Sequence, residues 1–399
     1  MSDTSGLRIV HVLRAPMGGV LRHVRDLALA QVDAGHQVGL VCDVPGPDGY
    51  NETMLGALGD GLPLGLHRVA MARAVGFGDI ASARAILAVL KRLKPDIVHG
   101  HGAKGGVHAR AIGALANRQA RPARLYSPHG GSLHFDPQSR TGKLYFAVER
   151  MLERACETIL FVADYERSVY ETKIGVPRCA THVVHNGLTP PEFEPVKPVA
   201  GAAAFLFIGE IRMLKGPDLF VDAIAALRAS GHADTNAVMV GAGPDRTAIA
   251  ERIGAHGLAS AVTMHDPMPA RDAFALAQTV VMPSRAEAMP YIVLEALAAG
   301  KPLIATHVGG IPEIVGSDNP ALVEPTLEAL TGVMRRSLDQ PGWLESHMVP
   351  ATTLKSRFSA AVMAESITNA YREALTRARS GAPVHPSRDT RANGASSVS

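Results

Sequence analysis

Two glutamates near the start of a predicted short helix carry the clearest chemical signal in the sequence. Pro290 suits a first helical turn, and Gly300 followed by Pro302 suits its end. Glu287 is therefore expected in the loop before the helix and Glu295 on its second turn. A helix N-terminus suits phosphate, whereas carboxylates accept hydrogen bonds from sugar hydroxyls. This layout suits a nucleotide-sugar, although a capped surface helix with two solvated glutamates has the same pattern.

Two cations occupy a predicted loop between a strand and a helix. Arg212 and Lys215 follow the apolar run 205–208 and precede a helical pattern that ends near Ala229. Arginine can hold two phosphate oxygens at once and lysine acts as a point charge, so the pair suits a diphosphate. Two solvated loop cations are the alternative.

Glycine pairs follow two further predicted strands. Gly18 and Gly19 follow the run 8–13, and Gly241 and Gly243 follow the run 237–240. Glycine lets a backbone approach a ligand closely. Pro244 interrupts the second pair, and no third glycine stands three residues beyond it, so a dinucleotide fingerprint is absent and a plain dehydrogenase is disfavoured.

A histidine at a strand end is a second catalytic candidate. His129 follows the predicted strand 124–127 and precedes two glycines. Ligands of open α/β sheets bind at the carboxyl ends of strands, so His129 is a candidate site residue, with a structural histidine in a turn as the alternative. His99, His101 and His134 rank lower and would bind an acceptor or line a cleft.

Strand and helix patterns alternate along the chain, which predicts parallel sheets covered by helices. The expected strands are 8–13, 37–42, 96–100, 124–127, 158–161, 180–185, 205–208, 237–240, 262–264, 279–282 and 303–306. The expected helices are 20–34, 81–93, 109–117, 143–155, 217–229, 245–256, 270–277, 326–338 and 359–377. The fold expected is α/β, with two doubly wound, Rossmann-like domains that face each other across a cleft.

A proline-rich segment marks the domain boundary. Residues 189–201 contain four prolines and little periodicity. We expect a first domain over 1–188 on the acceptor side, a linker over 189–202 and a nucleotide-sugar domain over 203–355. A helix over 356–379 would cross back to the first domain, and a Ser-, Arg-, Pro- and Gly-rich tail over 380–399 would be disordered.

These motifs together resemble one protein family, the retaining glycosyltransferases of family 4 with the GT-B fold. Glu287 and Glu295 match its Glu-x7-Glu motif. Four further segments look like that family: 185–187 (HNG), 209–216 (GEIRMLKG), 241–244 (GAGP) and 298–315 (AAGKPLIATHVGGIPEIV). The chain has Ala288 where most members carry glycine, and Glu210 where most carry arginine. A subset has the arginine two residues later, at the position of Arg212.

The resemblance implies roles for individual residues. His129 would lie near the donor sugar as an active-site residue, Glu287 would face that sugar, and Glu295 would contact the nucleotide ribose. The remaining donor-binding candidates are Gly18, Gly19, Arg212, Lys215, Gly241, Gly243 and the helix amides near Met289, Tyr291 and Ile292. No Asp-x-Asp motif stands in a suitable loop, so no metal ion and no cofactor are expected, the nucleotide-sugar being a substrate.

The family also implies the activity and its alternatives. The chain would transfer a sugar with retention to a glycan or lipid-linked acceptor, in cell-surface polysaccharide or glycolipid biosynthesis. A nucleotide-sugar epimerase, which needs no acceptor, and a non-catalytic nucleotide-sugar sensor are the alternatives. Product analysis with and without acceptor separates the three.

Composition restricts location and partners. The 399 residues include three widely spaced cysteines and no apolar run long enough to span a bilayer, and the N-terminus lacks a signal-peptide pattern. A cytoplasmic protein is expected. Residues 84–124 hold nine basic residues and one acidic residue, which predicts peripheral docking on the anionic inner face of the membrane, with a solvated basic face as the alternative. Aromatic residues are scarce in this window, which argues against nucleic acid.

Overall fold

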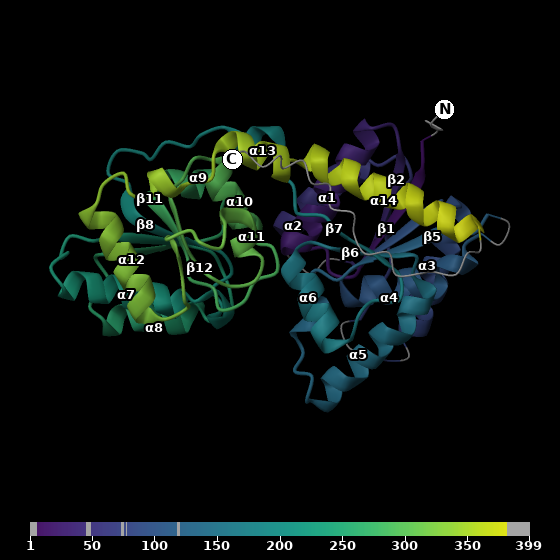
Figure 1. The fold of residues 1–399 in the computed structure, drawn as a ribbon, viewed down its shortest axis with the longest axis horizontal. Helices are drawn as coiled ribbons and strands as arrows, with labels where there is room; N and C mark the ends of the chain where they lie inside the picture. The colour runs from purple at the N-terminus through teal and green to yellow at the C-terminus, as the bar shows by residue number, and fades with distance from the viewer. Residues whose placement is uncertain (1–5, 45–48, 73–75, 77, 118–119, 381–399) are drawn as a thin grey trace, which may run out of the picture. The chain divides into compact units, whose positions relative to one another are not determined.

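The protein forms two α/β units in a computed structural model that describes residues 6–44, 49–72, 76, 78–117 and 120–380. Residues 1–184 together with 363–399 make the first unit, and residues 185–362 make the second. Each unit is built on one parallel sheet covered by helices (Figure 1). The expected architecture of two Rossmann-like domains is confirmed. The tail predicted to be disordered lies, from residue 381 onward, outside the described residues.

The first sheet has seven parallel strands in the order β3-β2-β1-β4-β5-β6-β7. Their bounds are β1 (Arg8–Leu13), β2 (Gln37–Cys42), β3 (Gly65–Arg68), β4 (Ile97–His101), β5 (Ala123–Ser127), β6 (Thr158–Phe161) and β7 (Ala180–Val183). The order reverses between β1 and β4, where His11 pairs with His99 and Leu13 with His101. Such a switch point is where ligands bind in doubly wound sheets.

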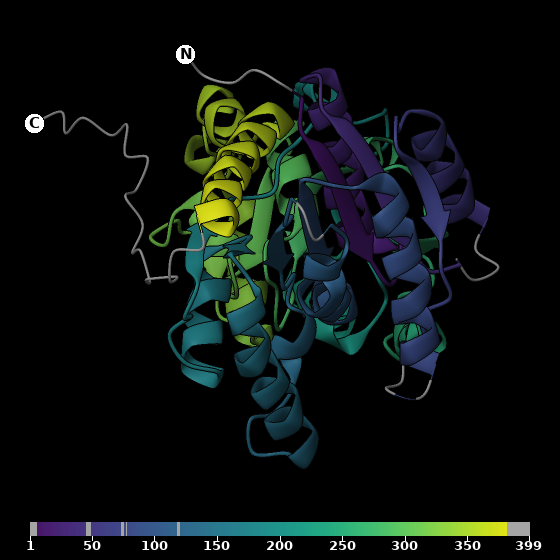
Figure 2. The same ribbon diagram turned by 90° about the vertical axis from the view of Figure 1, so that its right-hand side faces the viewer.

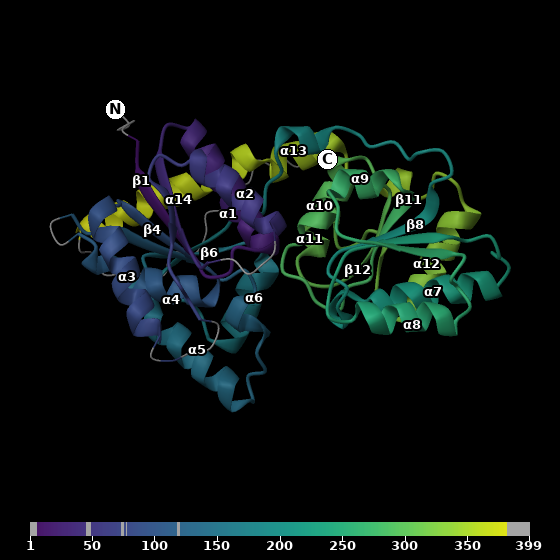
Figure 3. The same cartoon turned by 180° about the vertical axis from the view of Figure 1, so that it is seen from behind.

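Helices cover both faces of the first sheet. Residues of α1, α2 and α14 share one apolar core with the sheet, whereas α3 and α4 pack on the opposite face (Figures 2 and 3). The helices of this unit are α1 (Gly18–Asp33), α2 (Gly49–Asp60), α3 (Gly78–Leu93), α4 (Gly102–Ile112), α5 (Arg140–Leu152), α6 (Asp164–Lys173) and α14 (Ala360–Ser380). Ser359 Oγ accepts a hydrogen bond from the Val362 amide at the start of α14, as an N-cap should.

The second sheet has six parallel strands in the order β10-β9-β8-β11-β12-β13. Their bounds are β8 (Ala203–Ile208), β9 (Ala237–Val240), β10 (Val262–His265), β11 (Ala277–Met282), β12 (Leu303–Thr306) and β13 (Leu322–Val323). Its core takes side chains from α7, α8 and α12 on one face, and α9, α10 and α13 lie on the other (Figure 1). The helices are α7 (Pro217–Ala229), α8 (Arg246–Ala255), α9 (Ala270–Ala275), α10 (Tyr291–Ala298), α11 (Ile311–Val315), α12 (Leu327–Asp339) and α13 (Ala351–Phe358).

The helix predicted over 109–117 instead begins at Gly102. Its first turns contain three glycines, which disfavour helix on propensity alone. Tertiary packing needs them, because a β-carbon on Gly105 would lie 2.3 Å from the Val12 carbonyl oxygen. One on Gly106 would lie 2.2 Å from the Tyr126 ring. Close approach of α4 to the sheet therefore overrides propensity.

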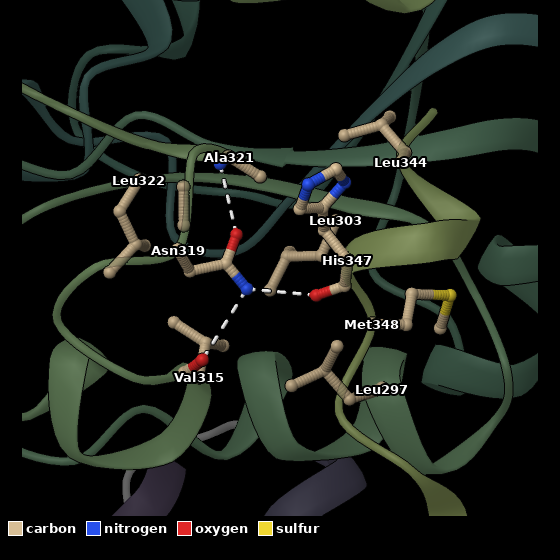
Figure 4. Close-up of a pocket in the computed structure, with 10 residues that line it drawn as sticks. Leu297, Leu303, Val315, Asn319, Ala321, Leu322, Leu344, His347 and Met348 are labelled. Carbon is tan, nitrogen blue, oxygen red and sulfur yellow. Dashed lines mark hydrogen bonds between the residues drawn. The ribbon is translucent and has the colours of Figure 1, made fainter. Parts of the chain in front are cut away.

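A small cavity in the second unit is structural rather than a ligand site. It has a volume of about 10 Å³ and is lined mainly by apolar side chains of α10, β12, the segment 315–322 and the segment 344–348 (Figure 4). Asn319 Nδ2 donates to the carbonyl oxygens of Val315 and His347, and Asn319 Oδ1 accepts from the Ala321 amide at 2.9 Å. This volume is at the lower limit for a single water molecule.

Candidate functional site

In the second unit the structure brings Lys215 and Glu287 together. Lys215 ends a short 3₁₀ turn between β8 and α7, and its Nζ lies 2.7 Å from both carboxylate oxygens of Glu287. Ser284 Oγ donates to Glu287 Oε1 at 2.7 Å. Glu287 is buried while Lys215 keeps 27% of its side chain exposed. The lysine ammonium has three donors, so it retains capacity toward a ligand while it neutralises the glutamate.

Backbone and side-chain contacts join the loops that carry this pair. The Arg285 amide donates to the Leu214 carbonyl at 2.8 Å, and the Arg285 guanidinium makes a bidentate ion pair with Asp218 at 2.8 and 2.7 Å. Burial opposes ionisation of Asp218, but hydrogen bonds from Arg285 outweigh it and hold the pKa of Asp218 below its ordinary value. Gly216 has φ +70°, and a β-carbon there would lie 2.0 Å from the Pro283 carbonyl oxygen.

Glu287 is also constrained from its other side. Gly309 has φ +63°, and a β-carbon there would lie 1.9 Å from the Glu287 carbonyl oxygen. Ala288 is not among the described residues with positive φ, so this loop does not require glycine at that position. Its carbonyl accepts from the Gly310 amide at 2.8 Å. Close packing on Glu287 therefore requires glycine at Gly309, whereas alanine fits at Ala288.

Helix α10 begins one residue later than predicted. Pro290 is extended, with ψ 122°, and precedes the helix because Tyr291 is its first residue. Glu295 is half-buried on the second turn, as expected. Ile292 lies in the first turn, whereas Met289 is two residues before the helix and its carbonyl accepts from Asn186 Nδ2 at 2.8 Å. Tyr291 and Ile292 thus belong to the N-terminal turn, and Met289 does not.

The remaining second-unit candidates differ in their surroundings. Arg212 is exposed, and within the described part of the chain no ion pair involves its side chain. Gly241 and Gly243 are needed for loop-on-loop packing, because β-carbons there would lie 1.9 Å from the Gly209 carbonyl oxygen and 2.2 Å from that of Ile211. Ligand contact by these three residues stays a prediction.

In the first unit a pocket of about 290 Å³ opens where β1, β4 and β5 end. Its lining includes Arg14, His101, Lys104 and His129. His129 has φ +51°, one of two described non-glycine residues with positive φ. Such backbone strain in a non-glycine residue is commonest at functional sites. Gly18 and Gly19, predicted in a loop, are instead the first residues of α1. Gly18 has φ +60°, and a β-carbon there would meet open space.

His129 belongs to a cluster of histidines that the sequence pattern only partly revealed. His101 Nδ1 lies 3.0 Å from His129 Nε2, and His101 Nε2 lies 2.9 Å from His11 Nδ1. The His23 ring stands edge-on to that of His129 at 4.7 Å. His99, on the same strand as His101, contacts Ser127 Oγ and the Tyr371 hydroxyl. Burial lowers the pKa of His11 to about 4 and those of His99, His101 and His129 well below the ordinary value.

Of the residues that we ranked below His129, two are in this cluster and one is not. His99 and His101 are buried, whereas His134 is exposed on the 3₁₀ turn after β5. Sequence reasoning missed His11, His23 and Gln31. A histidine inside an apolar strand, as in RIVHVL at 8–13, is the signal that could have found His11.

The basic window over 84–124 is not one exposed face. Arg110 pairs with Glu149 and Arg124 with Glu157, and both arginines are buried. Lys104 pairs with Asp79, and Arg121 also contacts Glu157. Arg118 lies outside the described residues. Among the described residues of the window, four exposed basic side chains without an ion pair remain: Arg84, Lys91, Arg92 and Lys94. The charge expected to meet a membrane is thus much smaller than the sequence suggested. No helix in the described segments has an apolar stretch long enough for a bilayer span.

Two family models match the chain, and they correspond to its two halves. "Glycosyltransferase Family 4" matches residues 17–190, and "Glycosyl transferases group 1" matches residues 202–340. Alpha-D-kanosaminyltransferase of Streptomyces kanamyceticus is 26% identical over 313 residues, which cover 71% of this chain and 79% of that protein. A D-inositol 3-phosphate glycosyltransferase of Acidothermus cellulolyticus is 31% identical over 46% of this chain and 44% of its own.

Solved structures of low sequence identity share the fold. The Anabaena protein HepE, in complex with UDP and glucose, superposes with a TM-score of 0.75 at 17% identity, over 92% of this chain and 99% of its own. WaaG, a glycosyltransferase involved in lipopolysaccharide biosynthesis, superposes with a TM-score of 0.69 at 17% identity, over 91% of this chain and 99% of its own. The two family matches identify the chain as a group 1, family 4 glycosyltransferase, and the solved structures show that it has the GT-B fold.

Proposed function

We propose that this glycosyltransferase moves a sugar from a nucleotide-sugar, with retention, to a glycan or lipid-linked acceptor. The observation that carries the proposal is the Lys215–Glu287 pair beside the N-terminus of α10. It supplies, in one place, a cation for phosphate and a carboxylate for sugar hydroxyls. HepE, the structural neighbour with UDP and glucose, makes a uridine nucleotide the first donor to test.

The chemistry follows from where charge develops. As the sugar leaves, negative charge builds up on the diphosphate, and Lys215, Arg212 and the first-turn amides of α10 would stabilise it. Glu287 would hold the sugar through a hydroxyl and Glu295 would hold the ribose. These fixed positive groups take the place that a divalent ion fills in other phosphate sites, so we propose transfer without metal or cofactor.

The acceptor belongs to cell-surface polysaccharide or glycolipid biosynthesis in this proposal, and the enzyme acts on the cytoplasmic side. Its three cysteines are free and buried, which suits a reducing compartment. Peripheral docking on anionic lipid would depend on Arg84, Lys91, Arg92 and Lys94, each worth about 1 kcal/mol near such a surface. Salt-sensitive co-sedimentation with anionic but not neutral vesicles tests this, and equal pelleting with both would refute it.

Donor choice is tested first by thermal shift with UDP-, GDP-, ADP- and dTDP-sugars, because a ligand that binds only the folded state raises the melting temperature. The responding donor is then incubated with candidate acceptors, and NMR of the product's anomeric centre reports retention or inversion. Full turnover in excess chelator is expected. An inverted product, or activity restored only by Mg²⁺ or Mn²⁺, would refute the corresponding part of the proposal.

Two isosteric variants test the assigned carboxylates. Glu287→Gln should mainly slow sugar transfer, because Glu287 is placed in the loop that would face the sugar. Glu295→Gln should mainly weaken nucleotide binding, because Glu295 is on α10. Calorimetry with the nucleoside diphosphate and turnover assays separate the two effects. Equal losses of diphosphate affinity in both variants would contradict the assignment.

A further inference from the structure

Three histidines and one glutamine form a continuous line of hydrogen bonds inside the first unit. From the pocket inward the contacts are His129 Nε2 to His101 Nδ1 at 3.0 Å, His101 Nε2 to His11 Nδ1 at 2.9 Å, and His11 Nε2 to Gln31 Oε1 at 3.0 Å. Gln31 comes from α1, and it is fully buried, as is His11. Because Gln31 is buried and its Oε1 has a specific partner, its side chain has a defined position in the fold.

This line of hydrogen bonds specifies which ring nitrogen carries each proton. With the Gln31 amide oriented so that its Oε1 faces His11, this oxygen only accepts, and His11 donates from Nε2. Each ring is held neutral, because burial lowers the pKa of His11 to about 4 and those of His101 and His129 well below the ordinary value. A neutral imidazole carries one proton, so His11 Nδ1 accepts from His101 Nε2. By the same step His101 Nδ1 accepts from His129 Nε2.

We propose that Gln31, acting through His11 and His101, fixes His129 in the Nε2–H tautomer, so that its Nδ1 is an acceptor for a substrate hydroxyl in the first-unit pocket. Among the described residues, no hydrogen bond involves His129 Nδ1. Gln31, His11 and His101 are positioning residues, since their effect reaches the substrate only through His129. The kinetic consequence rests on the proposed function, whereas the tautomer itself does not.

A metal ion is the main competing interpretation of this cluster. His11, His99 and His101, and separately His23, His101 and His129, have ligand atoms close enough to share one ion. However, both His99 nitrogens have partners, Tyr371 OH at 2.8 Å and Ser127 Oγ at 2.9 Å. The contacts from His101 to His11 and to His129 also have hydrogen-bond lengths. The line of hydrogen bonds from Gln31 through His11 and His101 to His129, which we call the relay, therefore accounts for the His11–His101 and His101–His129 distances without an ion.

The decisive measurement is the tautomer of His129, read from long-range ¹⁵N–¹H NMR of histidine-labelled full-length enzyme near neutral pH. The wild type should show protonated Nε2 and bare Nδ1. Gln31→Met, which keeps the volume but removes the acceptor, should give a tautomer mixture. Leu27→Met, a volume-conserving change in the core of the same helix, is the matched control.

Kinetics give an independent readout. Gln31→Met should lower kcat about 2- to 10-fold, the value of one neutral hydrogen bond, while diphosphate affinity stays unchanged because Lys215 and Arg212 belong to the other unit.

Several results would overturn the relay. They are a wild-type His129 with protonated Nδ1, a charged His129 at neutral pH, a tautomer insensitive to Gln31→Met, or stoichiometric zinc in the purified enzyme. The wild-type spectrum alone decides if Gln31→Met fails to fold. If no nucleotide-sugar is turned over, the proposed function fails, and the tautomer experiment still tests the relay.

Discussion

In the second unit the two central candidates, Lys215 and Glu287, are charged and neutralise each other, whereas in the first unit the candidates are neutral rings held by one another. Lys215 pairs with Glu287 near the surface, and Arg285 pairs with Asp218. His11, His101 and His129 instead have their protonation set by burial and hydrogen bonds.

The difference follows from desolvation. Keeping a group ionised costs little free energy when it retains access to water and has a partner of opposite charge. The cost is large when the group is buried among other titratable groups of the same kind. The second unit should therefore respond to charge deletion, anionic ligands and salt. The first unit should respond to acid. Each of the following experiments tests one side of this contrast.

The largest effect is expected from Lys215→Ala. The change removes the cation proposed for the diphosphate and leaves Ser284 as the hydrogen-bond partner of the buried Glu287 carboxylate among the described residues. Loss of one charge-assisted contact, roughly 1.5–3 kcal/mol, should weaken diphosphate binding about 10- to 150-fold by calorimetry. Lys197→Ala, at an exposed loop lysine of the same unit, is the control. Unchanged affinity in Lys215→Ala would make the pair purely structural.

Acid should destabilise the first unit before the second. Because the folded-state pKa of His11 is lowered to about 4, the unfolded chain binds a proton below pH 6.5 that the folded chain refuses. Stability is then lost as pH falls from 6.5 toward 4, by about 1.4 kcal/mol per pH unit and about 3 kcal/mol in total for this residue. The groups around His11 that share this environment are Gln31, His23, His99, His101, His129 and Tyr371.

The chain offers a simple way to see this order. Trp343 is the single tryptophan and is buried in the second core, so its fluorescence follows that unit, while circular dichroism follows both. In urea at about pH 5 the dichroism midpoint should fall further, relative to about pH 7.5, than the fluorescence midpoint. His11→Gln should reduce the gap. Coincident shifts of both probes would contradict separate responses of the two units.

Sequence reasoning recovered most of the framework because buried parallel strands read as short apolar runs. Strands such as 37–42 and 158–161 were predicted to the residue, and Gly300, with φ +69°, ends α10 as expected. Helices α2, α6, α11 and α13 and strands β3 and β13 were not predicted. The start of α4 was missed because its glycines disfavour a helix locally. They are needed for close contact with β1 and β5, which are distant in sequence.

The candidate site was likewise predicted only in part from the sequence. Motif spacing placed Lys215 and Glu287 in loops beside α7 and α10, but not their ion pair, which joins residues far apart in the chain. His129 was identified from its place after a strand. The hydrogen bonds that connect His129 to Gln31 could not be predicted, because they depend on how β1, β4 and α1 bring side chains together. The exposed charge of the window 84–124 was overestimated because a local charge count does not include ion pairs with Glu149 and Glu157, which lie outside it.

A smaller effect is expected from Arg212→Ala. Its side chain is exposed, so its contact with the diphosphate would be partly screened. We expect about a 10-fold loss of affinity, at the low end for a charge-assisted bond, and a smaller loss at high salt. Arg212→Lys should recover part of the affinity because the charge remains while bidentate geometry is lost. An effect larger than that of Lys215→Ala would reverse the proposed ranking of the two cations.

The smallest effect is expected from Asp218→Asn, which breaks the second ion pair of the same loops. Arg285 keeps 37% of its side chain exposed and Asp218 18%, so solvent screens much of their attraction. Hydrogen bonds from Arg285 hold the pKa of Asp218 below its usual value, so the stabilisation is present near neutral pH and is lost as pH falls through that lowered pKa.

Urea unfolding followed by Trp343 fluorescence should therefore show a loss below about 1 kcal/mol near neutral pH, which shrinks further at high salt. The Arg285 amide still bonds to the Leu214 carbonyl in this variant, so the loops should stay joined and diphosphate affinity should barely change. A loss of affinity as large as that in Lys215→Ala would mean that loop position, rather than the charge at Lys215, controls ligand binding in the second unit.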